Sequence, residues 1–128
     1  MGVFGNLFGS KEKEEKKELP WIPLTSKQQL VEIRDRSKSR PQFIFKHSTT
    51  CGISRMVLGM FTNNYPFDKE GADLYFLDLH AFREISNEVA AVFQVFHESP
   101  QLIVIKNGDV IFHTSHGAIA ETNLEEFK

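Results

Sequence analysis

The chain has 128 residues and a formal net charge of −2, and 41% of its residues are hydrophobic. This length fits one domain with a sizeable buried core, and the charge gives no positive field that would draw the chain to nucleic acid. The single cysteine excludes an intramolecular disulfide and a zinc site made of cysteines alone, and it fits a reducing compartment, the cytoplasm. We expect no secretion signal, no membrane-spanning segment and no stable membrane association.

The first residues differ in composition from the rest of the chain. The run KEKEEKKE mixes charges of both signs and contains no apolar residue, which is typical of a solvated segment. The alternative is that Phe4, Leu7 and Phe8 dock on a partner or a membrane surface, but they form a weak anchor without a basic face. We therefore predict a mobile arm over residues 1–18 and a single domain over residues 19–128.

The domain is predicted to begin with an extended segment and a helix. The segment LPWIPL, residues 19–24, contains two prolines and is typical of an extended lead-in. Thr25 or Ser26 is expected to cap the helix, which ends before Pro41. Its buried stripe is expected to contain Leu30, Val31 and Ile33.

The only cysteine follows the next predicted strand. Residues 42–46, QFIFK, are rich in β-formers, and the loop HSTT comes after them. Apolar residues then recur at helical spacing. They are Ile53, Met56, Val57, Met60 and Phe61. Cys51 is therefore predicted at a strand-to-helix junction, and a further strand is expected over residues 73–79.

The last third of the chain is predicted as helix, hairpin and helix. A helix lies within residues 82–96, with Ser86 or Asn87 as its cap. Its candidate core residues are Ile85, Val89, Val92, Phe93 and Phe96. The short strands LIVI and VIF flank Asn107 and Gly108, a pair typical of a tight hairpin turn. In the final segment, AIAETNLEEFK, we expect a helix with three inward residues. These are Ile119, Leu124 and Phe127.

The order of these elements predicts the fold class. A parallel crossover followed by an antiparallel hairpin and a helix gives a mixed sheet with helices on both faces. The fold class is therefore α/β, with a central sheet of about four strands and room for one more strand or helix before it.

Two motifs carry a resemblance to known proteins. A strand followed by C-x-x-S at a helix start, and the stretch ESPQLIVIKNGDVIFHTSHGAIAETNLEEF, resemble the thioredoxin fold over residues 25–128. Within that superfamily, TTCGIS with HESPQ resembles the monothiol bacilliredoxins. Members of that family are small cytosolic proteins implicated in removing bacillithiol, a low-molecular-weight thiol, from mixed disulfides.

The residues around Cys51 are suited to thiol chemistry. A helix N-terminus favours a thiolate over a thiol, and Lys46 and Arg55 are expected to add positive charge. Gly52 lets a substrate backbone come close. Ser54 lies one turn further on the same face, so its hydroxyl is expected to donate a hydrogen bond to the thiolate. The bland alternative is that Cys51 is an inert, buried small side chain.

The lack of a second cysteine sets the expected mechanism. No disulfide can close within the chain, so the intermediate must be a mixed disulfide with another molecule. Cys51 is expected to take the small thiol from an S-thiolated protein. A second small thiol or a redox partner then regenerates Cys51. We expect no bound cofactor, with bacillithiol as a co-substrate and oxidative stress as the setting.

The resemblance also assigns roles to residues further along the chain. It implies that the Ser99–Pro100 bond is cis and that the backbone of Ser99 binds a substrate chain. The alternative is a trans proline that starts an edge strand. The resemblance also implies that Gly117 faces the cysteine loop, which would place His47 and His116 near its rim.

Bacillithiol carries a malate and a sugar, so its site needs cations and hydrogen-bond donors. We expect these from Lys46, Arg55 and the backbone N–H groups of Thr50 and Gly52. The five histidines show no metal-binding spacing, so no metal site is predicted. Two alternatives stay open. One is an iron–sulfur cluster carrier, since CGIS is close to the CGFS of monothiol glutaredoxins; the other is a thioredoxin-like interaction module.

Overall fold

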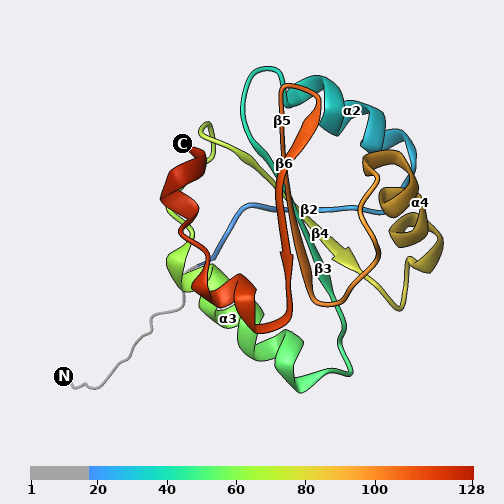
Figure 1. Ribbon diagram of the computed structural model, residues 1–128, viewed down its shortest axis with the longest axis vertical. Coiled ribbons are helices and arrows are strands. Elements are labelled where there is room, and N and C mark those ends of the chain that lie inside the picture. Colours follow the sequence, from blue (N-terminus) through green and yellow to red (C-terminus); the bar gives the residue numbers. More distant parts are fainter. Residues whose placement is uncertain (1–17) are drawn as a thin grey trace.

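The computed structural model describes residues 18–128, which form a mixed sheet with helices on both faces (Figure 1). The predicted arm therefore lies outside the described residues, apart from Glu18. The elements in chain order are β2 (Trp21–Pro23), α2 (Gln28–Arg36), β3 (Gln42–His47), α3 (Gly52–Asn64), β4 (Asp73–Asp78), α4 (Arg83–Phe93), β5 (Gln101–Lys106), β6 (Asp109–Ser115) and the 3₁₀ helices η1 (His116–Glu121) and η2 (Leu124–Phe127).

The sheet of the described residues has five strands in the order β2-β4-β3-β5-β6. The strands β2, β4 and β3 run parallel, whereas β5 is antiparallel to β3 and β6 is antiparallel to β5. The α/β class is confirmed, and the fifth strand is the predicted lead-in. Its residues from Trp21 to Pro23 pair with β4 at the edge of the sheet, where a proline is tolerated.

Two apolar layers lie on the two faces of the sheet. Figure 1 shows α2 and α4 together on one side and α3 with the C-terminal 3₁₀ helices on the other. Alternate residues of β3 enter the two layers: Ile44 faces α2 and α4, while Phe43 and Phe45 face α3. The strand β3 is buried along its whole length, as expected for a central strand covered by helices on both sides.

The predictions for several core and cap residues are wrong. Val31 and Phe96 are exposed, at 64% and 91%. The helix α4 ends at Phe93, and Gln94 then takes a left-handed conformation, so Phe96 leaves the helical stripe. In α3, Val57 and Phe61 are buried, but the other three expected residues are exposed. These are Ile53, Met56 and Met60.

The predicted caps are also replaced. The N-cap of α2 is Lys27, without a side-chain hydrogen bond, and the N–H groups of Thr25 and Ser26 instead donate to the amide oxygen of Gln29. The helix α4 begins at Arg83 and has Phe82 as its N-cap, so neither Ser86 nor Asn87 caps it. The helix forms one turn earlier than its cap-forming residues suggested.

The last segment forms two 3₁₀ helices in place of one helix. The break lies at Asn123, whose side chain accepts a hydrogen bond from the N–H of Glu125 and so competes with a continuous helix. The three residues expected to point inward are buried, as predicted. They are Ile119, Leu124 and Phe127.

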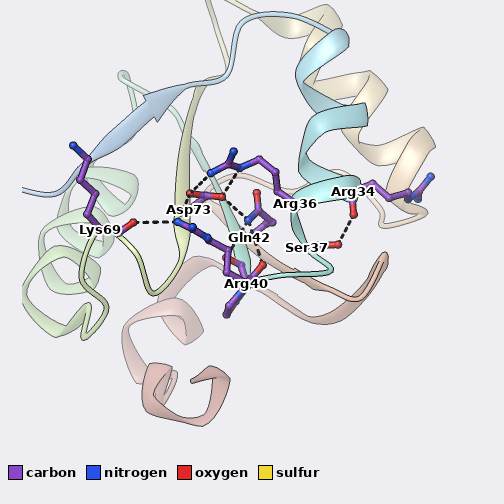
Figure 2. Close-up of polar contacts among 8 residues, drawn as sticks. Arg34, Arg36, Ser37, Arg40, Gln42, Lys69 and Asp73 are labelled. Carbon is purple, nitrogen blue, oxygen red and sulfur yellow. Dashed lines mark hydrogen bonds and ion pairs between the residues drawn. The ribbon is translucent and has the colours of Figure 1, made fainter.

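A charged cluster fixes the end of the sheet where β3 and β4 begin (Figure 2). The carboxylate of Asp73 accepts hydrogen bonds from Arg36 Nε and Nη2 at 2.8 and 3.2 Å and from Gln42 Nε2 at 2.7 Å. Arg40 Nη1 lies 3.6 Å from it. Burial alone would raise the pKa of Asp73, but these hydrogen bonds and positive charges lower it below its ordinary value. Asp73 thus ties α2 to both strands.

Candidate active site

Cys51 is the N-cap residue of α3 and is half-buried. Its N–H donates to the carbonyl of Ser48 at 3.3 Å, and its carbonyl accepts from the N–H of Arg55 at 3.2 Å. No side chain at the N-cap accepts from the first-turn N–H groups. A thiolate here is next to the free N–H groups and the positive end of the helix dipole, which both stabilise negative charge.

Ser54 is turned into the protein and not towards the sulfur. It is fully buried, and its Oγ accepts a hydrogen bond from the N–H of Ser48 at 3.1 Å. The same Oγ lies 2.8 Å from His47 Nδ1. The predicted hydrogen bond from Ser54 to the Cys51 thiolate is therefore not among the contacts of the described residues. Ser54 holds the loop that carries the cysteine.

His47 is the last residue of β3 and is buried beneath the cysteine loop. Burial lowers the pKa of His47; the nearby Asp78 carboxylate opposes this shift, and the Arg55 guanidinium adds to it. The imidazole is therefore neutral at pH 7, and either the Ser54 hydroxyl donates to Nδ1 or Nδ1–H donates to the hydroxyl. The expectation that His47 lies at the rim is wrong.

A second histidine, His80, holds the outer side of the same loop. Its Nε2 lies 2.9 Å from the Ser48 hydroxyl and 3.2 Å from the Thr50 hydroxyl. The backbone N–H of His80 donates to Asp78 at the end of β4. His80 was not among the predicted site residues. Its position just after the strand parallel to β3 is the signal that would have placed it beside the loop.

Lys46 lies on the other face of the sheet, and its predicted place in the thiol site is wrong. It is fully buried under α4, with Nζ 3.2 Å from the carbonyl of Ser86 and 3.2 Å from His97 Nδ1. Successive side chains of a strand point to opposite faces, so Lys46 and its neighbour His47 cannot share a side. Burial lowers the pKa of Lys46 to about 8.

Arg55 is the predicted cation that does lie beside the cysteine loop. Its Nη1 donates to the carbonyl of Thr49 at 3.4 Å, and its Nη2 is 3.8 Å from the place where a Cβ on Gly52 would lie. Thr50, Gly52 and Arg55 are all exposed. Together they offer a cation and polar groups on the open side of Cys51.

The Ser99–Pro100 peptide bond is cis, the geometry that the resemblance implied. The strand β5 starts at the next residue, Gln101, which pairs with Lys46 near the end of β3. The cis bond and Cys51 therefore both lie at the end of the sheet where β3 ends and β5 begins. Ser99 is the half-buried residue that precedes it.

The start of η1 lies against the same proline. The N–H of His116 donates to the carbonyl of Pro100 at 3.0 Å, and His116 has a positive φ of 56°. Gly117 follows it, is exposed, and has open space around its α-carbon. The helix η1 packs against α3. Gly117 is therefore placed near the site, while its contact with a substrate stays a prediction.

Residues 18–128 contain neither a candidate metal site nor a candidate membrane span. No group of three or more histidine, cysteine, aspartate or glutamate side chains in this part of the chain could hold a metal ion. Within the same range, no helix is both long enough and apolar enough to cross a membrane.

A family model described as monothiol bacilliredoxin BrxC matches residues 22–124, which include both motifs. The chain belongs to the monothiol bacilliredoxin family. The fold and this membership support a thiol redox role, of the kind that a thiol-disulfide oxidoreductase has. The cysteine that this bacilliredoxin offers for such chemistry is Cys51.

Solved structures confirm the thioredoxin fold. One, described as a thioredoxin-fold protein with a proposed oxidoreductase role, is 28% identical, with a TM-score of 0.70 over 83% of this chain and 91% of its own. Thioredoxin from Schistosoma mansoni is 19% identical, with a TM-score of 0.65 over 84% and 95%. Thioredoxin from Malassezia sympodialis is 17% identical, with a TM-score of 0.64 over 82% and 88%.

Proposed function

We propose that this protein is a cytoplasmic monothiol oxidoreductase that removes bacillithiol from S-thiolated proteins. The Cys51 thiolate attacks the bacillithiol sulfur of the mixed disulfide. A new disulfide forms between Cys51 and bacillithiol, and the protein sulfur leaves as a thiolate that takes a proton from water. No net oxidation occurs in this step, because one disulfide replaces another.

A second molecule completes the cycle. A thiolate of free bacillithiol, or of a redox partner, attacks the bacillithiol sulfur bound to Cys51. The products are reduced Cys51 and a disulfide that leaves with the attacking thiol. Ser54 occupies the position from which a second cysteine would act, and its hydroxyl cannot replace a thiol in this step. The reaction therefore depends on an external thiol.

One observation carries the proposal: the single cysteine is the N-cap of α3, and its side chain makes no capping hydrogen bond to the first-turn N–H groups. This placement makes Cys51 both a nucleophile and a leaving group. Arg55 and the N–H groups of Thr50 and Gly52 are the candidates for the malate and sugar of bacillithiol, because they border Cys51 on its open side. The backbone of Ser99 is the candidate for the protein chain.

The test is the release of bacillithiol from a modified test protein by catalytic amounts of the reduced chain, with free bacillithiol as the second thiol. We expect release by the native chain and no release above the background by Cys51→Ala. Cys51→Ala with an unchanged melting temperature is the matched control for fold. Equal release by the two proteins would overturn the proposal.

A further inference from the structure

A polar cluster under α4 has no part in the proposed reaction. Lys46 Nζ lies 3.2 Å from the carbonyl of Ser86 and 3.2 Å from His97 Nδ1. The hydroxyl of Ser86 lies 3.3 Å from the same Nδ1. The cluster sits on the face of β3 opposite to His47, so Lys46 acts on neither the sulfur nor the cysteine loop directly.

The cluster holds the segment that leads to the cis bond. Gln101 is the register partner of Lys46 on β5, so the two side chains lie next to each other on one face. Gln101 Nε2 donates to the carbonyl of Phe96 at 3.0 Å, and its Oε1 accepts from the N–H of Glu98 at 3.4 Å. Lys46 and Gln101, which are neighbours in the sheet, thus make hydrogen bonds that fix residues 96–98.

The same segment is held from its other side by β6 and η1. The carboxylate of Glu98 accepts a hydrogen bond from the hydroxyl of Ser115 and lies 3.5 Å from His116 Nδ1. His97 and Glu98 are both exposed, yet each has fixed polar contacts. An exposed loop held this firmly on both sides is suited to presenting a backbone in one position.

Burying a lysine here has a desolvation cost that an apolar side chain would not have. Lys46 is fully buried, and no carboxylate is within ion-pair distance of it among the described residues. Burial of its ammonium lowers the pKa to about 8. A methionine of similar length would occupy the same volume without a buried charge, so packing alone does not account for a lysine here.

We propose that Lys46 is a positioning residue for the substrate protein: through His97 it fixes residues 97–99 so that the Ser99 backbone can receive the chain that carries the mixed disulfide. This inference rests on the proposed function, and it concerns binding of the protein part of the substrate. A purely structural role is the competing account. In that account, Lys46 anchors α4 through Ser86 and affects the whole domain.

The variants Lys46→Met and His97→Ala separate the two accounts, with Lys38→Met and His113→Ala as matched controls on exposed side chains. Each of the two variants should raise KM for a bacillithiolated protein about tenfold, and the double variant should raise it no further. Alkylation of Cys51 by iodoacetamide, which needs no bound chain, should stay within about twofold of the native rate. The melting temperature of Lys46→Met should equal or exceed that of the native chain.

A native KM in both variants would overturn the inference. So would a lower melting temperature together with slower alkylation in Lys46→Met, since that pair of changes is the structural account. Amide exchange tests the inference even if the native chain releases no bacillithiol. The Glu98 N–H should exchange at least about tenfold faster in Lys46→Met than in the native protein, and an unchanged rate would contradict the positioning role.

Discussion

The two ends of the parallel strands β3 and β4 are built in opposite ways. At the start of the strands, the buried carboxylate of Asp73 is surrounded by Arg36, Arg40 and Gln42 (Figure 2). At their far end, the buried Ser54 hydroxyl accepts from the N–H of Ser48 and lies beside the ring of His47, and Cys51 caps the N-terminus of α3. The first end has its charges paired and stabilises the fold. The second end leaves a positive helix terminus open for a reactive sulfur.

Asp73→Ala tests whether the paired charges at the start of the strands stabilise the fold. The substitution removes the buried carboxylate that accepts from Arg36 and Gln42, and the Arg36 guanidinium left behind is half-exposed. We therefore expect the free energy of unfolding to fall by about 1.5–3 kcal/mol, the cost of lost hydrogen bonds to a charged group. Urea denaturation measures the loss, and Asp35→Ala, at an exposed ion pair on α2, should change stability by no more than about 0.5 kcal/mol. The second-order rate of bacillithiol release by the folded fraction should stay native. A reduced rate would show that the two ends are coupled.

Lys46 differs from Asp73 because it is a buried charge with no carboxylate within ion-pair distance among residues 18–128. Its pKa is lowered in the folded state, so the unfolded chain binds more protons between about pH 8 and its ordinary value of 10.5. Burial of the ammonium therefore lowers the free energy of unfolding by its full amount below pH 8. The lost stability should be recovered as the pH rises to 10.5, by up to about 3 kcal/mol.

The measurement is urea denaturation of the native chain and of Lys46→Met from pH 7 to 10.5. The stability advantage of Lys46→Met should shrink across this window, while the difference between the native chain and Lys38→Met should stay constant. A constant difference for Lys46→Met would mean that the buried amine does not titrate in this range.

Ser54→Ala tests how the reactive end is held together. It leaves the buried N–H of Ser48 without its acceptor, which should cost about 1–3 kcal/mol of stability. Thr62→Ala is the control on the same helix, since the Thr62 hydroxyl donates to the carbonyl of Leu58 one turn earlier, and it should cost no more than about 0.5 kcal/mol. If the two variants lose the same stability, Ser54 does not anchor the loop.

Arg55→Gln should have the smallest effect. The side chain is exposed, so we expect the rate of bacillithiol release to fall about three- to fivefold at low salt, with stability unchanged. Kinetics with a mixed disulfide of a neutral thiol should show a smaller decrease, because that thiol has no malate for the guanidinium. Lys38→Gln, at an exposed side chain in the turn after α2, should leave both rates native. Equal decreases for the two disulfides would show that Arg55 does not bind the malate of bacillithiol.

The local pattern around the cysteine was predictable, and the tertiary contacts were not. A strand, a short loop and a helical repeat placed Cys51 at a helix start, and Asn107 with Gly108 marked the hairpin. Lys46 was misplaced because β3 is apolar on both faces, so its pattern does not tell one face from the other. His47 and His80 are 33 positions apart and meet the same loop only because β3 and β4 run parallel side by side.

The core residues show the same limit. Val57 and Phe61 are four positions apart and are buried, as expected. Met56 and Met60 are also four positions apart, but they are exposed. The position of α3 on the sheet decides which stripe is covered. Phe96 was misassigned because the left-handed Gln94, and no proline or glycine, ends α4.

Intact mass spectrometry can show whether the reaction stops at a mixed disulfide on Cys51. Equal amounts of the reduced chain and a bacillithiolated test protein are mixed without free bacillithiol, quenched with acid and weighed. We expect the chain to gain the mass of one bacillithiol while the test protein loses it, and we expect Cys51→Ala to gain nothing. A test protein that keeps its bacillithiol, under conditions where a generic thiol removes it, would contradict thiol transfer to Cys51.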